Sequence, residues 1–104
     1  MNHEELLEQV KRTIHESEPD AEIILYGSRA RRDSDEQSDW DFLILLDGHV
    51  DDERIDKIRH HIYEIEWACD EVLCSIIISR EEWNSPLYKS MPFHRNVELE
   101  GIVI

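Results

Sequence analysis

Apolar positions recur along this chain at two spacings, one typical of helices and one typical of strands. A helical stripe predicts an amphipathic helix over about residues 3–17: Leu6, Leu7, Val10 and Ile14. A similar stripe predicts a second helix from Asp51 or Asp52 to about Ala68: Ile55, Ile58, Ile62 and Ile65. Residues 92–100 are the last predicted helix, with Gly101 as the residue that ends it.

Three apolar runs, at residues 21–26, 39–46 and 72–78, predict strands. The middle run is apolar on both faces beyond Asp41, which predicts a central strand covered on both sides except at its N-terminal end. Residues 102–104 are apolar, and they either pair as an edge strand or are covered by a partner chain. This alternation predicts one domain over residues 1–104, a small α/β (α+β) fold with a mixed sheet of three to four strands backed by helices.

Composition limits the classes of function to be expected of this chain. The chain carries 25 acidic against 11 basic residues, a net charge of −14, so extended nucleic-acid binding is not expected. No apolar run approaches the ~20 residues of a membrane span, and the N-terminus lacks the features of a signal peptide. We therefore expect a cytoplasmic protein with no membrane contact.

Cysteines and aromatic residues are expected in the core. Cys69 and Cys74 match no zinc or redox spacing, which favours buried, reduced thiols. The aromatic residues at core-like positions are interpreted as packing residues: Trp40, Tyr63, Trp67, Trp83, Tyr88 and Phe93.

The most informative stretch begins where the first strand ends. Gly27 permits a tight turn and the close approach of a ligand to the backbone. Ser28 then falls at the start of a short helix, where free N–H groups favour phosphate. Arg29, Arg31 and Arg32 follow within four positions and form a local basic patch on an acidic body. Such a patch suits a small phosphate-bearing ligand or one defined partner.

Two aspartates open the second strand. Asp39 and Asp41 are two residues apart, so both side chains leave the same face of the strand. Carboxylate oxygens at this spacing suit Mg²⁺ that also contacts substrate phosphates. The alternative interpretation is a polar strand entrance in which Ser38 and Asp39 cap a turn.

These segments carry a family resemblance. GSRARR, followed after a loop by SDWDFLILL, resembles the GSxARG…SDxDLxV signature of the nucleotidyltransferase superfamily with the DNA polymerase β-like fold. At this length the chain most resembles the minimal nucleotidyltransferases (MNT), which are often partnered with HEPN proteins. The resemblance implies Mg²⁺-dependent transfer of a nucleoside monophosphate from an NTP, ATP being the first candidate, to a hydroxyl of a protein or small molecule.

The resemblance also implies roles for individual residues. It implies that Asp39 and Asp41 are the catalytic carboxylates and the metal ligands. Nucleotide binding falls to residues on either side of the loop: Gly27, Ser28, Arg31 and Ser38.

The chain departs from the family pattern at two positions. Arg32 stands where the family usually has glycine, and the third metal-binding carboxylate is replaced, with Ser75, or alternatively Cys74, at the matching position. Two interpretations therefore stay open, an active enzyme and a catalytically degenerate module that acts as an antitoxin-like partner of a HEPN protein. The acidic body and apolar C-terminus suit either such a partner or a homo-oligomer.

Overall fold

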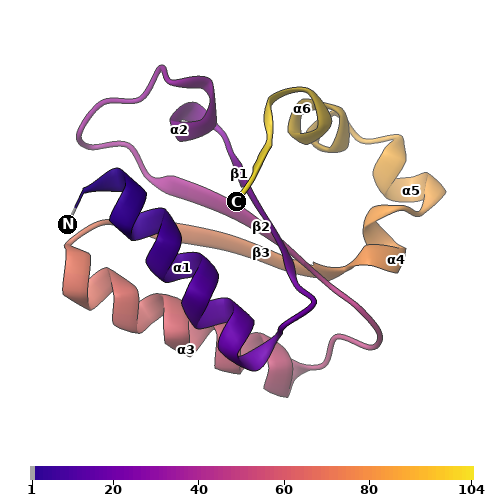
Figure 1. The fold of residues 1–104 in the computed structure, drawn as a ribbon. Coiled ribbons are helices and arrows are strands. Elements are labelled where there is room, and N and C mark those ends of the chain that lie inside the picture. The colour runs from indigo at the N-terminus through magenta and orange to yellow at the C-terminus, as the bar shows by residue number, and fades with distance from the viewer. Residues whose placement is uncertain (1) are drawn as a thin grey trace.

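The computed structural model describes residues 2–104. Its elements, shown in Figure 1, follow in this order: α1 (His3–Ser17), β1 (Glu22–Tyr26), α2 (Ser28–Arg31), β2 (Trp40–Leu46), α3 (Asp52–Cys69), β3 (Leu73–Ser79), α4 (Arg80–Trp83), α5 (Pro86–Lys89), α6 (Pro92–Glu100) and β4 (Ile102–Val103). The strands form one four-stranded sheet in the order β3-β2-β1-β4. β2 runs antiparallel to β1 and parallel to β3, and β4 runs antiparallel to β1. Helices on a mixed sheet confirm the expected α+β class.

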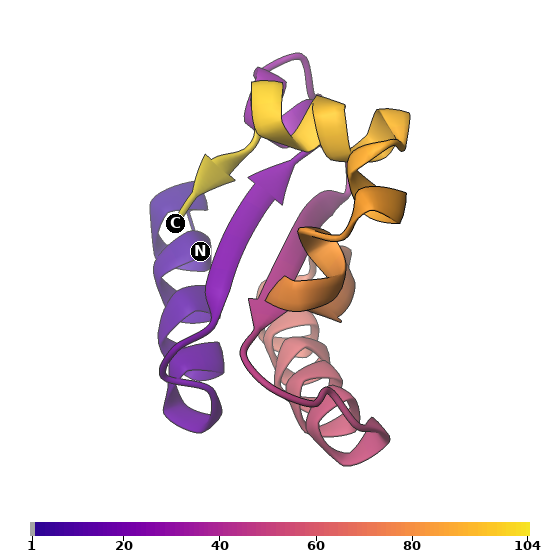
Figure 2. The same cartoon turned by 90° about the vertical axis from the view of Figure 1, so that its right-hand side faces the viewer.

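Helices cover both faces of the sheet (Figure 2). α1 and α3 lie on one face, where Phe42 and Ile44 of β2 join their buried stripes. Leu43 and Leu45 point to the opposite face and pack beneath α4 and α6, against Trp83 of α4. Each of these β2 side chains is at most 3% exposed. The central position predicted for this strand is therefore confirmed, and side-chain alternation on β2 decides which core each residue joins.

Side-chain caps fix where the helices begin. Asn2 accepts a hydrogen bond from the Glu5 amide at 2.8 Å and so caps α1. Asp51 caps α3 in the same way, by accepting from the Arg54 amide at 2.9 Å. Ser79 caps α4 by accepting a hydrogen bond from the Glu82 amide, so the chain leaves the sheet directly after β3.

The C-terminal residues pair as an edge strand, the first of the two alternatives raised by the sequence. Ile102 of β4 lies opposite Leu25, and the Ile104 amide donates a hydrogen bond to the Ile23 carbonyl at 2.9 Å. These bonds cover the outer edge of β1.

Gly101 ends α6 for a reason other than the predicted one. Its φ of −66° is open to any residue, so no left-handed C-terminal turn is present. Glycine is needed because a Cβ here would lie 2.5 Å from the Val97 carbonyl oxygen and 2.7 Å from Ile24 Cγ2. The residue allows α6 to turn closely onto β1.

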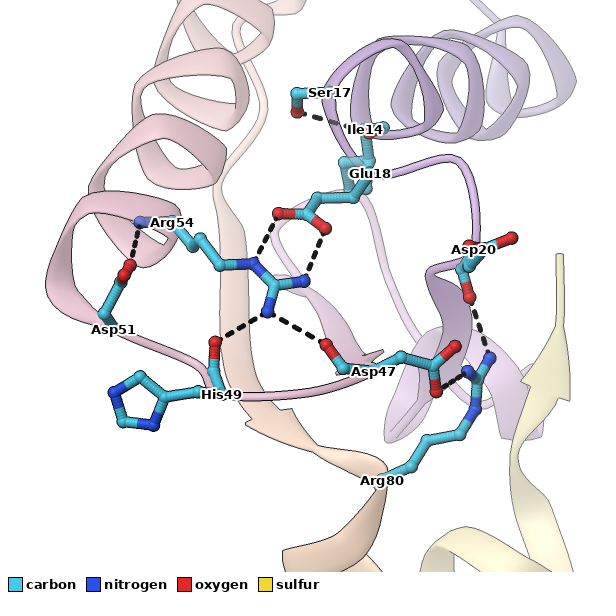
Figure 3. A network of polar contacts seen from close by, with 9 residues as sticks. All are labelled: Ile14, Ser17, Glu18, Asp20, Asp47, His49, Asp51, Arg54 and Arg80. Carbon is cyan, nitrogen blue, oxygen red and sulfur yellow. Dashed lines mark hydrogen bonds and ion pairs between the residues drawn. The ribbon is translucent and has the colours of Figure 1, made fainter.

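Arginines tie the loops together at the end of the sheet where β1 begins and β2 ends (Figure 3). The Arg54 guanidinium donates to both Glu18 carboxylate oxygens, at 2.9 and 2.6 Å, and to the carbonyls of Asp47 and His49 at 2.9 and 2.7 Å. Arg80 bridges Asp47 to the Asp20 carbonyl in the same region. We call this set of contacts, centred on Arg54, the arginine clamp.

Two expectations about the core are wrong. Cys74 is exposed and Cys69 is half-buried, although both thiols are free as expected. Tyr63 and Trp67 are 55% and 76% exposed, because the buried stripe of α3 runs along other positions of the helix: Ile58, Ile62 and Ile65. Within residues 2–104, no helix has the length and apolar character that crossing a membrane requires.

Candidate active site

Three strand ends meet at the opposite end of the sheet from the arginine clamp. Asp41 of β2 lies between Tyr26 at the end of β1 and Cys74 near the start of β3. Residues opposite one another on neighbouring strands point to the same face, so these three side chains form one row across the sheet. Asp39 lies two residues earlier, just before β2 begins at Trp40.

The two aspartates lie close enough to influence each other. Burial raises the pKa of the Asp41 carboxyl above its usual value, the negative charge of Asp39 raises this pKa further, and Arg31 lowers it. Asp39 is exposed and its Oδ2 lies 3.8 Å from Cys74 Sγ. The aspartates are therefore grouped at one site, and a cation between them would relieve their mutual repulsion.

Gly27 brings the turn after β1 directly against Asp41. Its φ of 75° and ψ of −157° belong to a region that essentially only glycine occupies. A Cβ at Gly27 would lie 2.6 Å from Asp41 Oδ2. The Gly27 carbonyl accepts hydrogen bonds from the Ala30 and Arg31 amides at 3.1 and 3.0 Å, and these bonds start α2. The turn, the short helix and the acid therefore share one small region.

Ser28 and Arg31 lie at the two ends of α2, beside this turn. Arg31 is exposed and forms ion pairs with Asp33 at 3.0 Å and with Glu100 of α6 at 3.2 Å. Its positive charge lies close enough to the site to lower the pKa of Asp41. An incoming phosphate would compete with carboxylates that already hold this guanidinium.

Ser38, the remaining residue proposed from the sequence, belongs to the loop before β2. Its hydroxyl accepts a hydrogen bond from the Asp35 amide at 3.0 Å and donates to Asp35 Oδ1 at 3.3 Å. These contacts turn the side chain toward the loop. The Ser38 carbonyl, in contrast, accepts a hydrogen bond from a residue of α2.

Arg29 is the residue that holds that carbonyl, and its role was not predicted. Its side chain is only 5% exposed, its Nη2 donates to the Ser38 carbonyl at 2.9 Å, and its guanidinium carbon lies 4.5 Å from the centre of the Trp40 ring. Arg29 therefore adds no exposed guanidinium group to the basic patch that the sequence predicted. It joins α2 to the backbone that carries both aspartates, and no local sequence pattern marks it, because its burial depends on a residue of the next strand.

The strand register places Cys74, and not Ser75, beside Asp41. Ser75 lies opposite Phe42 and so points to the other face of the sheet, which corrects the position first assigned to the missing carboxylate. Burial raises the pKa of the Cys74 thiol, and the charges of Asp39 and Asp41 raise it further. The same position is thus filled by a neutral thiol at neutral pH.

Arg32, the other departure from the family pattern, adopts the left-handed conformation with φ of 63° and ψ of 27°. Glycine takes this conformation without steric cost, whereas other residues are disfavoured by about 1–2 kcal/mol. The backbone therefore explains why glycine suits this position.

Two carboxylates, of Asp39 and Asp41, are the donor groups that this site offers to a divalent cation. Among residues 2–104, no group of three or more histidines, cysteines, aspartates and glutamates is arranged to hold a metal ion. Mg²⁺ in phosphate-transfer sites usually takes one or two carboxylates, several waters and the substrate phosphates. Asp39 and Asp41 fit that use of the ion, in which the substrate completes the coordination.

A strand, a glycine turn and a short helix lie beside two spaced aspartates at one end of a mixed sheet. The chain belongs to the nucleotidyltransferase domain family, whose model matches residues 5–102. A comparison with curated proteins finds no match. Family membership gives nucleotidyl transfer as the general chemistry and a nucleoside triphosphate as the substrate class, and such domains typically use a divalent metal.

Proposed function

We propose that this protein is a Mg²⁺-dependent nucleotidyltransferase that moves a nucleoside monophosphate from an NTP, most simply ATP, to a hydroxyl group of a protein or small molecule. The observation that carries the proposal is the placement of Asp39 and Asp41 at one site with Gly27 packed against Asp41. Family membership supports the reaction class.

The chemistry is an in-line displacement at the α-phosphorus. The acceptor oxygen forms the new P–O bond, the bond to the β-phosphate oxygen breaks, pyrophosphate leaves, and the hydroxyl proton passes to solvent. Bound Mg²⁺ would supply charge neutralisation on the phosphoryl oxygens. Asp39 and Asp41 would hold the ion, and the turn at Gly27 and Ser28 would orient the β- and γ-phosphates. Arg31 and Ser38 would support the triphosphate from α2 and from the loop.

Cys74 favours a second candidate function. A neutral thiol beside Asp41 cannot replace the charge of a carboxylate, nor can it readily accept the proton of the acceptor hydroxyl. The alternative is therefore a degenerate nucleotidyltransferase-fold module that binds nucleotide without turnover and acts as an antitoxin-like partner of a HEPN protein. Co-purification from the native host, followed by identification of the bound chain, tests this partnership.

Transfer of label from ATP labelled at the α-phosphate separates the two candidates. The enzyme proposal predicts Mg²⁺-dependent labelling of an acceptor by the wild-type protein and loss of labelling in the double variant Asp39→Asn, Asp41→Asn. A matched control removes two exposed charges elsewhere, by Glu8→Gln and Asp56→Asn, and should label normally. Equal labelling by the double variant would overturn the proposal.

Cys74→Asp tests the missing carboxylate directly. If the thiol limits catalysis, this change should raise the rate of labelling, because it adds a carboxylate beside Asp41. A wild-type protein that binds Mg·ATP but transfers nothing, together with a Cys74→Asp variant that does transfer, would favour the degenerate module.

A further inference from the structure

Two aromatic side chains stand in solvent on α3, on the far side of that helix from its buried stripe. Trp67 is 76% exposed and Tyr63 is 55% exposed, and their ring centroids lie 6.2 Å apart in an edge-to-face arrangement. The other two tryptophans, Trp40 and Trp83, are only 3% and 6% exposed. Isolated apolar residues are common on protein surfaces, but a Tyr–Trp pair in mutual contact offers a large, rigid contact area of the kind enriched at binding sites.

Carboxylates surround this pair. Glu66 and Asp70 line a shallow hollow together with Tyr63 and Trp67. Residues 63–71, YEIEWACDE, contain four acidic residues and no basic one. Glu66 Oε2 accepts a hydrogen bond from the Leu73 amide at 2.9 Å, which fixes this carboxylate at the edge of the hollow. Aromatic faces bordered by carboxylates attract a guanidinium or ammonium group through both its charge and its stacking on the rings.

Charge also decides what does not fit the hollow. A second copy of this chain, docked through the same surface, would bring acids against acids on a protein of net charge −14. A nucleic acid would meet the same repulsion from its phosphates. A partner that carries basic side chains gains attraction at the same place.

We propose that the surface formed by Tyr63, Glu66, Trp67 and Asp70 is a docking site for a basic segment of another protein. An arginine side chain of that segment contacts the two aromatic rings on one side and the carboxylates on the other. This site lies on α3, on the opposite face of the sheet from α4 and α6, and it requires no catalytic activity of the domain.

Fluorescence titration with a synthetic arginine–glycine repeat peptide tests the proposal, because Trp67 is the exposed tryptophan and reports contact at the site. The expected result is saturable binding with a change in tryptophan emission, weakened by salt and absent with a glutamate–glycine repeat peptide. Calorimetry on Trp67→Ala, which leaves the charge unchanged, should show a loss of affinity of about tenfold. Asp70→Asn should also weaken binding, and asparagine tolerates the left-handed backbone at this position.

Matched variants separate a specific site from general attraction to an acidic protein. Leu99→Ala removes an apolar side chain of 73% exposure, and Glu81→Gln removes one exposed charge on α4; neither should change affinity by more than twofold. Equal losses for Trp67→Ala and Leu99→Ala would overturn the proposal, as would the absence of arginine-peptide binding. A concentration-dependent dimer in sedimentation that Trp67→Ala abolishes would also overturn it, since a second copy would then be the occupant.

Discussion

Gly27 does two things that no other residue type could do in its place. Its backbone lies in a region where a side chain costs about 1–3 kcal/mol, and the space where a Cβ would project is taken by the Asp41 carboxylate. The turn can therefore pass directly over the acid. The close contact between Gly27 and Asp41 brings the end of β1 and the start of β2 together at one site.

Gly27→Ala should lower the free energy of unfolding by at least about 1–3 kcal/mol, because it adds backbone strain and displaces Asp41. Chemical denaturation measures the change. Gly48→Ala is the matched control: its φ is 76°, but no atom beyond its chain neighbours lies within 4 Å of the added Cβ. The control should show the backbone cost alone and leave Mg²⁺ binding intact, whereas equal effects of the two changes on Mg²⁺ binding would argue against a special contact at Gly27.

Asp41→Asn should make the metal-free protein more stable at neutral pH. The folded-state pKa of Asp41 is raised above 3.8, so the proton is held more tightly in the folded state. Protonated Asp41 therefore contributes its full stabilisation at pH values below 3.8, the ordinary pKa. This stabilisation is lost as the pH rises through the higher folded-state pKa. Asparagine does not ionise and avoids the loss.

Thermal unfolding of both proteins in EDTA, across acidic to neutral pH, tests this prediction. The difference in unfolding midpoint should grow as pH rises and then level off. A difference that is constant with pH, or that shrinks toward neutrality, would contradict the raised pKa. Added Mg²⁺ should reduce the advantage of the variant, because the ion stabilises only the protein that binds it.

The parallel pairing of β2 and β3 decides which side chains reach the site. This register places Cys74 beside Asp41, and it also carries Leu73 and Ile77 into the core shared with α1 and α3. Between β2 and β3 the chain must form α3, and the arginine clamp fixes the start of that helix against the end of α1. The clamp therefore supports the register from the far end of the sheet.

Arg54→Lys should lower the free energy of unfolding by about 1–3 kcal/mol, because lysine keeps the charge but its compact ammonium group cannot reproduce the four hydrogen bonds that the planar guanidinium makes to Glu18 and two loop carbonyls. Urea denaturation measures the change. Arg59→Lys, at an exposed position of the same helix, is the control and should be neutral. A loss for Arg54→Lys no larger than that for Arg59→Lys would show that the clamp is incidental.

Local signals predicted the helices well and long-range pairing poorly. Asn2 and Asp51 are caps that can be read in the sequence, and the spacing of apolar residues shows which face of α1 and α3 is buried. The choice between Cys74 and Ser75 depended on strand register, which neighbouring residues do not encode. The pairing of residues 102–104 likewise depended on the free edge of β1.

Within the whole molecule, the candidate site and the arginine clamp lie at opposite ends of one sheet, with helices on both faces. The spacing of Asp39 and Asp41 and the glycine turn were evident from sequence, because strand periodicity and backbone freedom are local properties. Their distance in space, the burial of Arg29 and the exposure of Trp67 were not evident, because each depends on how separate elements pack. The acidic protein, of net charge −14, thus has two separate proposed binding surfaces, the metal site and the docking surface on α3.

We propose that Asp39 and Asp41 hold Mg²⁺ together with an NTP bound at the Gly27 turn. Calorimetric titration with a non-hydrolysable ATP analogue, with and without Mg²⁺, tests it most directly. The wild-type protein and the charge-matched control Glu8→Gln, Asp56→Asn should bind the analogue only with Mg²⁺, and Asp39→Asn, Asp41→Asn should bind at least about tenfold more weakly. Equal binding by the double aspartate variant, or no Mg²⁺-dependent binding by the wild type, would contradict the account.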